Sequence, residues 1–331
     1  MKPLSYARPR TQAEAAALVR RSPDAVFIAG GTNLTDLMKL DVVTPDLLVD
    51  VQDLDLTELT HHEWGTVVGA GVTNAGLAGD IGIRRRYPLV SEAILAGASG
   101  QIRNAASIAG NLLQRTRCGY FQDVTKPCNK RSPGSGCPAI AGAHRELGVL
   151  GTSEHCVATH PSDMAVALAA LDAVVRVRRA TGSVSALTLD ELYRLPGDRP
   201  DRDTTLEPGD LVTAVELPAP TGAPSRYRKV RDRTSFAFAL VSVAAMLKVE
   251  DGVAVDVRLA YGGVAPRPWR ARTAEAALLG ERPTDSLITQ ALQAEFATAR
   301  PLPDNAFKIN LAASLTRAVV RDLAPAQKAG R

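Results

Sequence analysis

The chain has 331 residues, of which 45% are apolar, 39 are basic and 35 are acidic, giving a net charge of +4. This length is enough for two or three domains with packed cores, and so small and scattered a charge argues against nucleic-acid binding. No apolar stretch approaches the roughly 18 residues of a membrane span. The start, MKPLSYARPR, lacks the apolar region of a signal peptide, and four cysteines are too few for a secreted disulfide scaffold. We therefore expect folding in the cytoplasm with reduced thiols.

The first unit is predicted over residues 1–57 as a small α/β arrangement. Apolar residues at helical spacing predict a helix over 11–21, and short apolar runs predict buried strands over 26–29 and 47–51. A second, shorter helix is expected over 35–40, directly after a turn that contains two adjacent glycines.

That turn, at residues 29–34, has the composition of a ligand-binding loop. Gly30 and Gly31 allow the backbone to approach a ligand closely, and successive N–H groups at a helix start can hold phosphate oxygens. An ordinary tight turn between strand and helix remains the alternative. The pattern is neither G-x-G-x-x-G nor a P-loop, so it supports neither a Rossmann site nor a nucleoside-triphosphate site.

The second unit is predicted over residues 58–218. It opens with an alternating strand over 65–73 and contains the polar segment Ser107-Ile108-Ala109-Gly110-Asn111. This segment could bring backbone against a ligand or could be a capped turn. Farther along, Ser162 is a good N-cap and Asp163 suits the first turn of the helix that follows, so capping alone explains both residues.

The third unit is predicted over residues 225–331, after the linker sequence PAPTGAP at 218–224. Strands are expected over 227–230, 236–249 and 253–261, followed by helices. Strands followed by helices are typical of an α+β domain, so the chain as a whole is predicted to be α+β.

A long loop between the second unit's helices contains all four cysteines. Cys118, Cys128, Cys137 and Cys156 have the spacing C-x9-C-x8-C-x18-C in a segment rich in proline and glycine. The spacing lacks the close pairs of structural zinc sites, and disulfides require an oxidising compartment. Unrelated buried thiols and an iron–sulfur cluster with four converging thiolates remain open.

Basic residues surround these cysteines. They are Arg115, Arg117, Lys126, Lys130 and Arg131. They could offset the negative charge of a thiolate-bound cluster, face a partner protein, or form a solvated surface.

Three segments together resemble a known family. Ala29-Gly30-Gly31-Thr32-Asn33-Leu34, Ser107-Ile108-Ala109-Gly110-Asn111 and His160-Pro161-Ser162-Asp163 are similar to the FAD-contacting segments of the medium subunits of molybdenum hydroxylases, which include xanthine dehydrogenase, carbon monoxide dehydrogenase and aldehyde oxidoreductases. The resemblance implies a two-subdomain FAD-binding module of the vanillyl-alcohol-oxidase (PCMH-like) type, followed by a C-terminal α+β domain of a small sheet with helices.

The resemblance also implies the cofactor contacts. They are Phe27, Ile28, Ala29, Gly30, Gly31, Thr32, Asn33, Leu34, Thr35, Ser107, Gly110, Asn111, Asp163 and Lys229. The turn from Ile28 to Thr35 would hold the FAD pyrophosphate, and Asp163 would bind the ribose or adenosine end. No acid, base or nucleophile constellation of the chain's own is visible, which fits a redox relay.

The cysteine loop, residues 114–157, narrows the resemblance to aldehyde oxidoreductase FAD subunits with an inserted [4Fe-4S] cluster. Cys118, Cys128, Cys137 and Cys156 would be its ligands. The β subunit of 4-hydroxybenzoyl-CoA reductase also has an inserted cluster and is the nearer alternative; a flavin-free cluster-binding assembly module and a stand-alone flavin enzyme are two others.

The family's assembly supplies the remaining expectations. A large partner subunit would hold the molybdenum cofactor and oxidise an aldehyde, and a small partner would carry two [2Fe-2S] clusters. Electrons would then collect on FAD in this chain and leave to an external acceptor. Export of the folded complex to the periplasm would depend on a twin-arginine signal on a partner.

Overall fold

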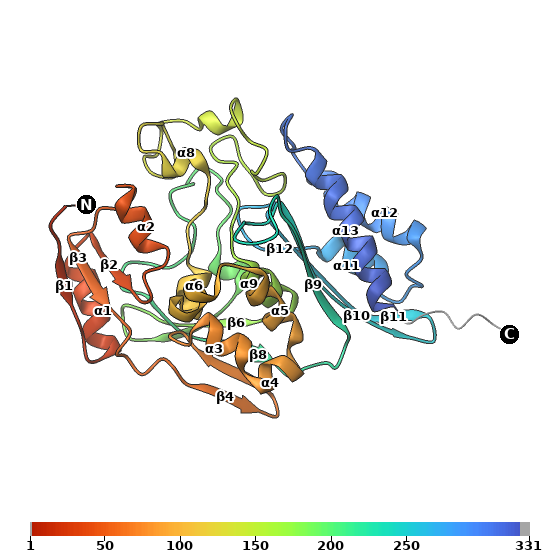
Figure 1. Cartoon of the computed structure of the whole chain (residues 1–331), viewed down its shortest axis with the longest axis horizontal. Coiled ribbons are helices and arrows are strands. Elements are labelled where there is room, and N and C mark those ends of the chain that lie inside the picture. The colour runs from red at the N-terminus through yellow and green to blue at the C-terminus, as the bar shows by residue number, and fades with distance from the viewer. Residues whose placement is uncertain (1, 325–331) are drawn as a thin grey trace.

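The computed structural model describes residues 2–324 as three sheets that follow one another along the chain (Figure 1). The last residues of the predicted third unit, 325–331, lie outside the described part. Among the described helices, none is long and apolar enough to cross a membrane.

The first sheet is parallel, with strand order β1-β3-β2. Its strands are β1 (Ser5–Ala7), β2 (Ala25–Ile28) and β3 (Leu47–Asp50), and its helices are α1 (Gln12–Arg21) and α2 (Leu34–Lys39). The Thr11 hydroxyl accepts a hydrogen bond from the Glu14 N–H and so begins α1. Because β2 leads directly into the glycine turn and α2, the turn lies at the carboxyl end of a parallel strand, where α/β sheets commonly bind ligands.

The second sheet is antiparallel, with strand order β4-β5-β8-β6-β7. Its strands are β4 (Leu59–His62), β5 (Gly65–Gly69), β6 (Val174–Arg178), β7 (Val184–Thr188) and β8 (Leu211–Pro218). The helices of this part are α3 (Asn74–Gly79), α4 (Ile81–Arg86), α5 (Pro88–Ala96), α6 (Gly100–Ala105), α7 (Ile108–Leu112), α9 (Asp163–Ala170) and α10 (Leu189–Leu192). The strand predicted over 65–73 ends at Gly69, because the Val72 N–H bonds back to the Gly69 carbonyl and turns the chain.

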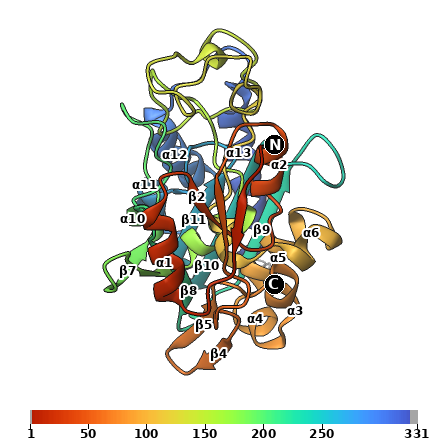
Figure 2. The same ribbon diagram turned by 90° about the vertical axis from the view of Figure 1, so that its left-hand side faces the viewer.

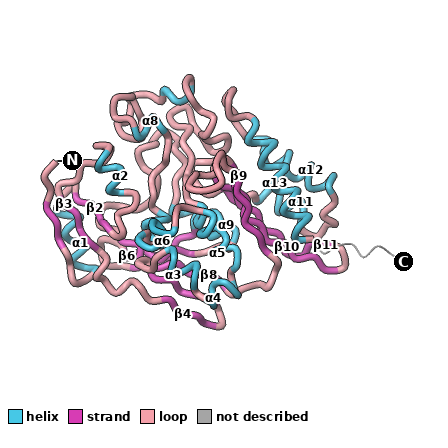
Figure 3. Tube along the Cα trace, in the orientation of Figure 1, coloured by secondary structure: helices cyan, strands magenta, loops and turns pink. Residues whose placement is uncertain are grey.

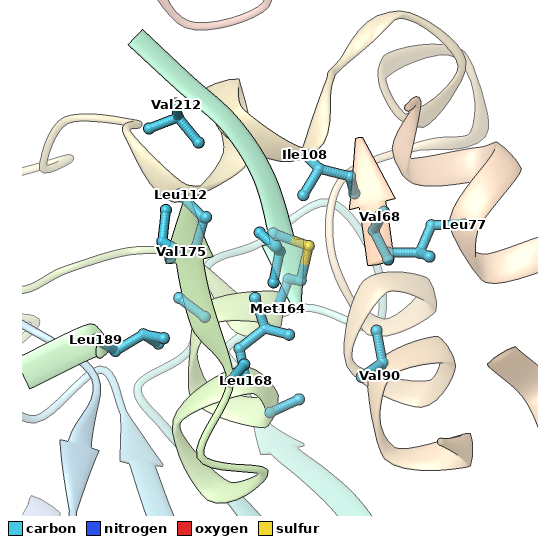
Figure 4. Packing of buried hydrophobic residues seen from close by; sticks show 14 of the residues in the cluster. Val68, Leu77, Val90, Ile108, Leu112, Met164, Leu168, Val175, Leu189 and Val212 are labelled. Carbon is cyan, nitrogen blue, oxygen red and sulfur yellow. The ribbon is translucent and has the colours of Figure 1, made fainter. Parts of the chain in front are cut away.

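Helix α9 lies at the centre of the largest core. All eight of its residues are buried, and Met164 and Leu168 pack among Ile108, Leu112 and Val175 (Figure 4). A helix that is apolar on all sides must be enclosed on all sides. Its N-terminal residue, Asp163, is therefore held by the whole surrounding core.

Residues 113–162 form a long excursion between α7 and α9. Only α8 (Gly119–Gln122) and the short 3-10 helix Pro138–Ile140 are regular within it. Figure 3 shows this excursion as a set of loops above the helices and strands of the first two sheets, and Figure 2 shows it from the side. A small core of its own, including Phe121, Ala139 and Val157, supports it.

The third sheet is antiparallel, with strand order β12-β11-β10-β9. Its strands are β9 (Ser225–Val230), β10 (Val241–Glu250), β11 (Val253–Gly262) and β12 (Trp269–Arg270), and its helices are α11 (Arg272–Leu278), α12 (Asp285–Glu295), the 3-10 helix Phe296–Thr298 and α13 (Phe307–Leu323). The helices cover one face of the sheet, and the other face packs toward α5 and α9 (Figures 1 and 2).

Strand β10 shows why this region is apolar in sequence. Val243 and Ala245 face the C-terminal helices, whereas Ala244 and Met246 join the core around α9. A strand buried on both faces reads as a continuous apolar run. The prediction of a strand over 236–249 was wrong for residues 236–240, which form a loop; Phe236 has φ +49, a left-handed conformation incompatible with a strand.

Candidate functional site

The glycine turn lies against helix α6. A Cβ atom on Gly30 would come within 1.7 Å of the Ala105 carbonyl oxygen, so only glycine fits there. Gly31 has φ +70, and its carbonyl accepts from the Thr35 N–H and hydroxyl to begin α2. Within residues 2–324, the N–H groups of 30–33 donate to no protein acceptor. Such a row of N–H groups is suited to an anionic group.

Hydrogen bonds join the three segments that the sequence singled out. The Asn33 side-chain oxygen accepts from the Arg115 N–H at 2.9 Å. The Asn111 side-chain oxygen accepts from the Ser162 hydroxyl at 2.5 Å, and that hydroxyl also accepts from the Ala165 N–H as the cap of α9. The first segment is therefore fixed to the chain just after the second, and the second is fixed directly to the third.

Ser107 and Gly110 build the second segment. The Ser107 hydroxyl accepts from the Gly110 N–H at 3.1 Å, which caps α7. Ser107 is buried, so its own role here is to cap, while Gly110 and Asn111 line the open space. The capped turn that the sequence offered as one alternative is therefore present, and a ligand contact by Gly110 and Asn111 stays a prediction.

Asp163 and Lys229 form the charged end of the same space. The Lys229 ammonium donates to an Asp163 carboxylate oxygen at 2.7 Å, and the Tyr227 hydroxyl donates to the other oxygen at 2.5 Å. Burial and the adjacent carboxylate raise the pKa of Tyr227 well above its usual value. Both carboxylate oxygens of Asp163 therefore have partners within the protein. Asp163 is also the first residue of α9.

These residues line one cavity. Of the fourteen predicted cofactor contacts, those on its wall are Thr32, Asn33, Gly110, Asn111, Asp163 and Lys229. The other eight are not on this wall: Phe27, Ile28, Ala29, Gly30, Gly31, Leu34, Thr35 and Ser107. Two buried amide atoms on the cavity residues, Asn33 Nδ2 and Asn74 Oδ1, have no protein partner, and buried polar atoms of this kind require a ligand or water.

Sequence reasoning missed several residues on the cavity wall. Arg103, which donates to the Gly97 carbonyl at 2.6 Å, and the aromatic residues of the 236–240 loop carry no local motif. Tyr227 is not on the wall but bonds Asp163. It had a usable signal, since it lies two residues before Lys229 on β9 and so shares a face with it.

A second cavity opens beside the first. It lies between the cysteine loop, residues 232–240 and the ends of β10 and β11, and both cavities share Arg117, Pro161, Asp163 and Phe238. At its rim, Arg145 makes two hydrogen bonds to the Asp232 carboxylate, at 2.7 and 3.0 Å, and joins the cysteine loop to the 232–240 loop.

The four cysteines converge. Cys118, Cys128, Cys137 and Cys156 line one small cavity within the loop, and all four are free thiols. Burial raises the pKa of Cys118 and of Cys137, and that of Cys156 to about 11. Across the described residues, no group of three or more His, Cys, Asp or Glu is arranged to hold a single metal ion.

Charged and polar contacts hold this loop in shape. Arg131 donates to the carbonyls of Tyr120, Phe121 and Lys126. The buried Lys130 ammonium, which lines the thiol cavity, donates to the Pro200 carbonyl and to Asp203. Asp203 also pairs with Arg115 at 2.5 Å. Burial alone would raise the pKa of Asp203, but Arg115 and Lys130 outweigh it and lower the pKa.

The fold and cavity together define a class, the flavin-binding subunits built from two small domains and a C-terminal sheet domain. Residues 2–220 match the family model described as "FAD binding domain in molybdopterin dehydrogenase", and residues 225–323 match "CO dehydrogenase flavoprotein C-terminal domain". The chain therefore belongs to the FAD-binding medium subunits of the molybdenum hydroxylase family, as the three sequence segments predicted.

Individual relatives agree with this assignment. The chain is 51% identical to the aldehyde oxidoreductase FAD-binding subunit PaoB of Escherichia coli (strain K12), over 94% of this chain and 95% of that protein. It is 27% identical to the glyceraldehyde dehydrogenase medium chain of Sulfolobus acidocaldarius, over 86% and 84% of the two chains. Among solved structures, reconstituted CO dehydrogenase from Oligotropha carboxidovorans matches with a TM-score of 0.76 and 24% identity, over 98% of this chain and 99% of that chain. The last similarity concerns the fold, which confirms the predicted fold class.

Proposed function

We propose that this chain is the FAD-containing electron-transfer subunit of a molybdenum-dependent aldehyde oxidoreductase. The observation that carries the proposal is the convergence of the three segments and Lys229 on one cavity, in a chain 51% identical to an aldehyde oxidoreductase FAD-binding subunit. In the proposed assembly, a large subunit with the molybdenum cofactor oxidises the aldehyde, and a small subunit passes electrons through [2Fe-2S] clusters to this chain.

The residues present fit FAD. The unpartnered N–H groups of residues 30–33 suit its pyrophosphate, and the orphaned Asn33 and Asn74 amide atoms supply further polar contacts. Bound FAD supplies the exchange between one-electron and two-electron chemistry. The chain's own contribution is to bind and orient FAD and to hold a cation, the Lys229 ammonium, at a fixed place beside it. Asp163 keeps that ammonium in position.

We also propose that the loop holds a [4Fe-4S] cluster through Cys118, Cys128, Cys137 and Cys156. Its support is the donor set, because four free thiols line one cavity. In a four-iron cluster each thiolate binds a different iron, so the thiols need not meet at the single point that one metal ion requires. Burial disfavours the thiolate of Cys156, whereas the nearby Lys130 ammonium favours it, since it acts to lower the pKa of Cys156.

The FAD proposal is tested by the spectrum of the purified chain and by release of its cofactor. We expect flavin absorption and one FAD per chain. Absence of flavin after reconstitution with FAD would contradict the proposal and favour a flavin-free assembly module. Turnover of aromatic aldehydes by the complex purified with its partners tests the reaction; reduction of an aromatic acyl-CoA instead would favour the 4-hydroxybenzoyl-CoA reductase-like alternative.

The cluster proposal has a separate test. Cys128→Ser should lower the iron content and the broad visible absorption while FAD remains bound. Ser132→Ala, in the same turn, is the matched control and should keep both. Unchanged iron in the Cys128 variant would remove the ligand assignment without affecting the FAD proposal.

Two further proposals concern organisation. The domain limits proposed are 1–57, 58–218 and 225–331, with the cluster loop at 114–157. For the compartment, we propose cytoplasmic folding, followed by export to the periplasm if a partner subunit carries a twin-arginine signal. Fractionation of cells that produce the complete complex tests the compartment.

A further inference from the structure

Arg117 occupies the junction between the flavin cavity and the cysteine loop. It immediately precedes Cys118 and lines both the first cavity and the adjoining second cavity. Its guanidinium lies over the ring of Phe238, 4.8 Å from the ring centroid. One end of the side chain donates to the Arg115 carbonyl.

The charge of Arg117 is not neutralised locally. Among residues 2–324, no carboxylate lies within ion-pair distance of it, and Asp36 acts on it only from farther away. A guanidinium stays protonated in proteins, so the side chain is a cation. A guanidinium has five N–H donors, and the protein's one carbonyl contact uses only part of them.

The other arginines of the loop differ from Arg117 in this respect. Arg115 pairs with Asp203, and Arg145 pairs with Asp232. Arg131 is satisfied by three backbone carbonyls. Among these arginines, Arg117 therefore has guanidinium N–H groups without a protein acceptor, and its side chain lines a cavity. Arg117 is half-buried. A cation partly removed from water without a counter-ion is costly, and a ligand that supplies negative charge lowers that cost.

We propose that Arg117 is a direct ligand of FAD, which donates charge-assisted hydrogen bonds to an electron-rich group of the bound cofactor and connects it to the cysteine loop. The inference rests on the proposed FAD function. Two parts of FAD have the required chemistry: the pyrophosphate, and the ring edge, which carries a negative charge after two-electron, one-proton reduction. Cys118, the next residue, lines the thiol cavity, so Arg117 lies between that cavity and the flavin cavity along the chain.

A contact to the FAD pyrophosphate and a contact to the FAD ring give different results in one experiment. The full chain is depleted of FAD, and Arg117→Gln and Arg117→Lys are compared with the wild type for FAD affinity and for flavin midpoint potential by spectroelectrochemistry. Loss of hydrogen bonds to a charged group should weaken FAD binding about 10- to 100-fold, with the lysine variant closer to the wild type. If Arg117 contacts the pyrophosphate, affinity falls and the potential stays. If it contacts the ring, the potential also falls, by about 30 mV for each tenfold preferential loss of the reduced form.

Arg131→Gln is the matched control, since it disturbs the same loop through backbone carbonyls alone. It should leave FAD affinity and potential at the wild-type values. Unchanged affinity and potential in both Arg117 variants would overturn the inference, as would an Arg131 variant with the same losses as Arg117→Gln. A wild-type chain that binds no FAD would instead overturn the proposed function itself, and the inference with it. Should Arg117→Gln fail to fold, Arg117→Lys decides the question, because three N–H donors in place of five should still weaken FAD binding measurably.

Discussion

The ammonium of Lys229 and the carboxylate of Asp163 form a buried ion pair at 2.7 Å, between the third sheet and the core of the second domain. Only 4% and 9% of the two side chains are exposed. Because Asp163 begins α9 and Lys229 lies on β9, the pair fixes the C-terminal domain against the FAD-type module at the wall of the cavity.

Removing one charge of this pair should lower the free energy of unfolding. Asp163→Asn leaves the Lys229 ammonium without its counter-ion, and breaking a buried pair in this way costs about 3–5 kcal/mol. We expect a lower free energy of unfolding and weaker FAD binding, measured by denaturant titration and by FAD titration. The control is Asp322→Asn, which removes the exposed partner of Arg228 on the same strand and should cost less than about 1 kcal/mol. Equal effects in the two variants would contradict the role given to the pair.

A single methyl group at Gly30 should damage the cavity. The Cβ of Gly30→Ala would lie 1.7 Å from the Ala105 carbonyl oxygen, so either the turn or α6 must move. We expect FAD affinity to fall at least about tenfold, because the N–H groups of the turn lose their common orientation. Gly100→Ala, at the start of α6, meets nothing within 4 Å and should bind FAD as the wild type does. Normal FAD binding by the Gly30 variant would show that the turn does not hold the cofactor.

The sequence was informative where a local rule decides the structure. The cap of Ser162, the glycine turn and the linker before β9 each depend on neighbouring residues, and the helix and strand predictions around them agree with the structure. The strand predicted over 236–249 failed at its start because Phe236 takes a left-handed conformation, and the loop faces a cavity that only the tertiary fold creates.

The cavity itself depends on long-range contacts. The sequence shows that four cysteines lie in one loop. It could not predict that Cys118 and Cys156 line the same small cavity. Similarly, Asp163 read as a capping residue, and its partners Tyr227 and Lys229 are more than sixty positions away. The family resemblance named Asp163 and Lys229 as separate cofactor contacts, and only the structure shows that they bind each other and Tyr227.

Asp203 should be needed for the order of the cysteine loop. It pairs with both Arg115 and Lys130, so Asp203→Asn leaves two cations of the loop without their shared counter-ion. We expect faster limited proteolysis within residues 114–157 and a lower iron content per chain. Asp201→Asn, two residues earlier, removes only the partner of the exposed Arg199 and serves as control. Wild-type iron and protease resistance in the Asp203 variant would mean that the loop is held by its apolar core and by Arg131 alone.

His160 should make the protein sensitive to mild acid. Its Nε2 atom bonds the Leu112 carbonyl at 3.2 Å, its Nδ1 atom accepts from the Ser162 N–H at 3.4 Å, and its ring packs edge-on against Tyr193. These contacts suit the neutral ring, with the proton on Nε2. Burial lowers the pKa of His160 from 6.5 to about 4.

The sign of the effect follows from proton uptake. Between pH 6.5 and 4 the unfolded chain binds a proton at His160 that the folded chain does not bind, so stability is lost as the pH falls through this window. From pH 8 to pH 5 the loss at this one site is about 2 kcal/mol. His160→Gln keeps a hydrogen-bonding side chain but cannot titrate. The difference in unfolding free energy between the wild type and His160→Gln should therefore be largest at pH 8. It should be smaller by about 2 kcal/mol at pH 5, because only the wild type loses stability at this site. Parallel stability curves across this range would mean that the His160 ring is protonated in the folded protein as readily as in the unfolded chain.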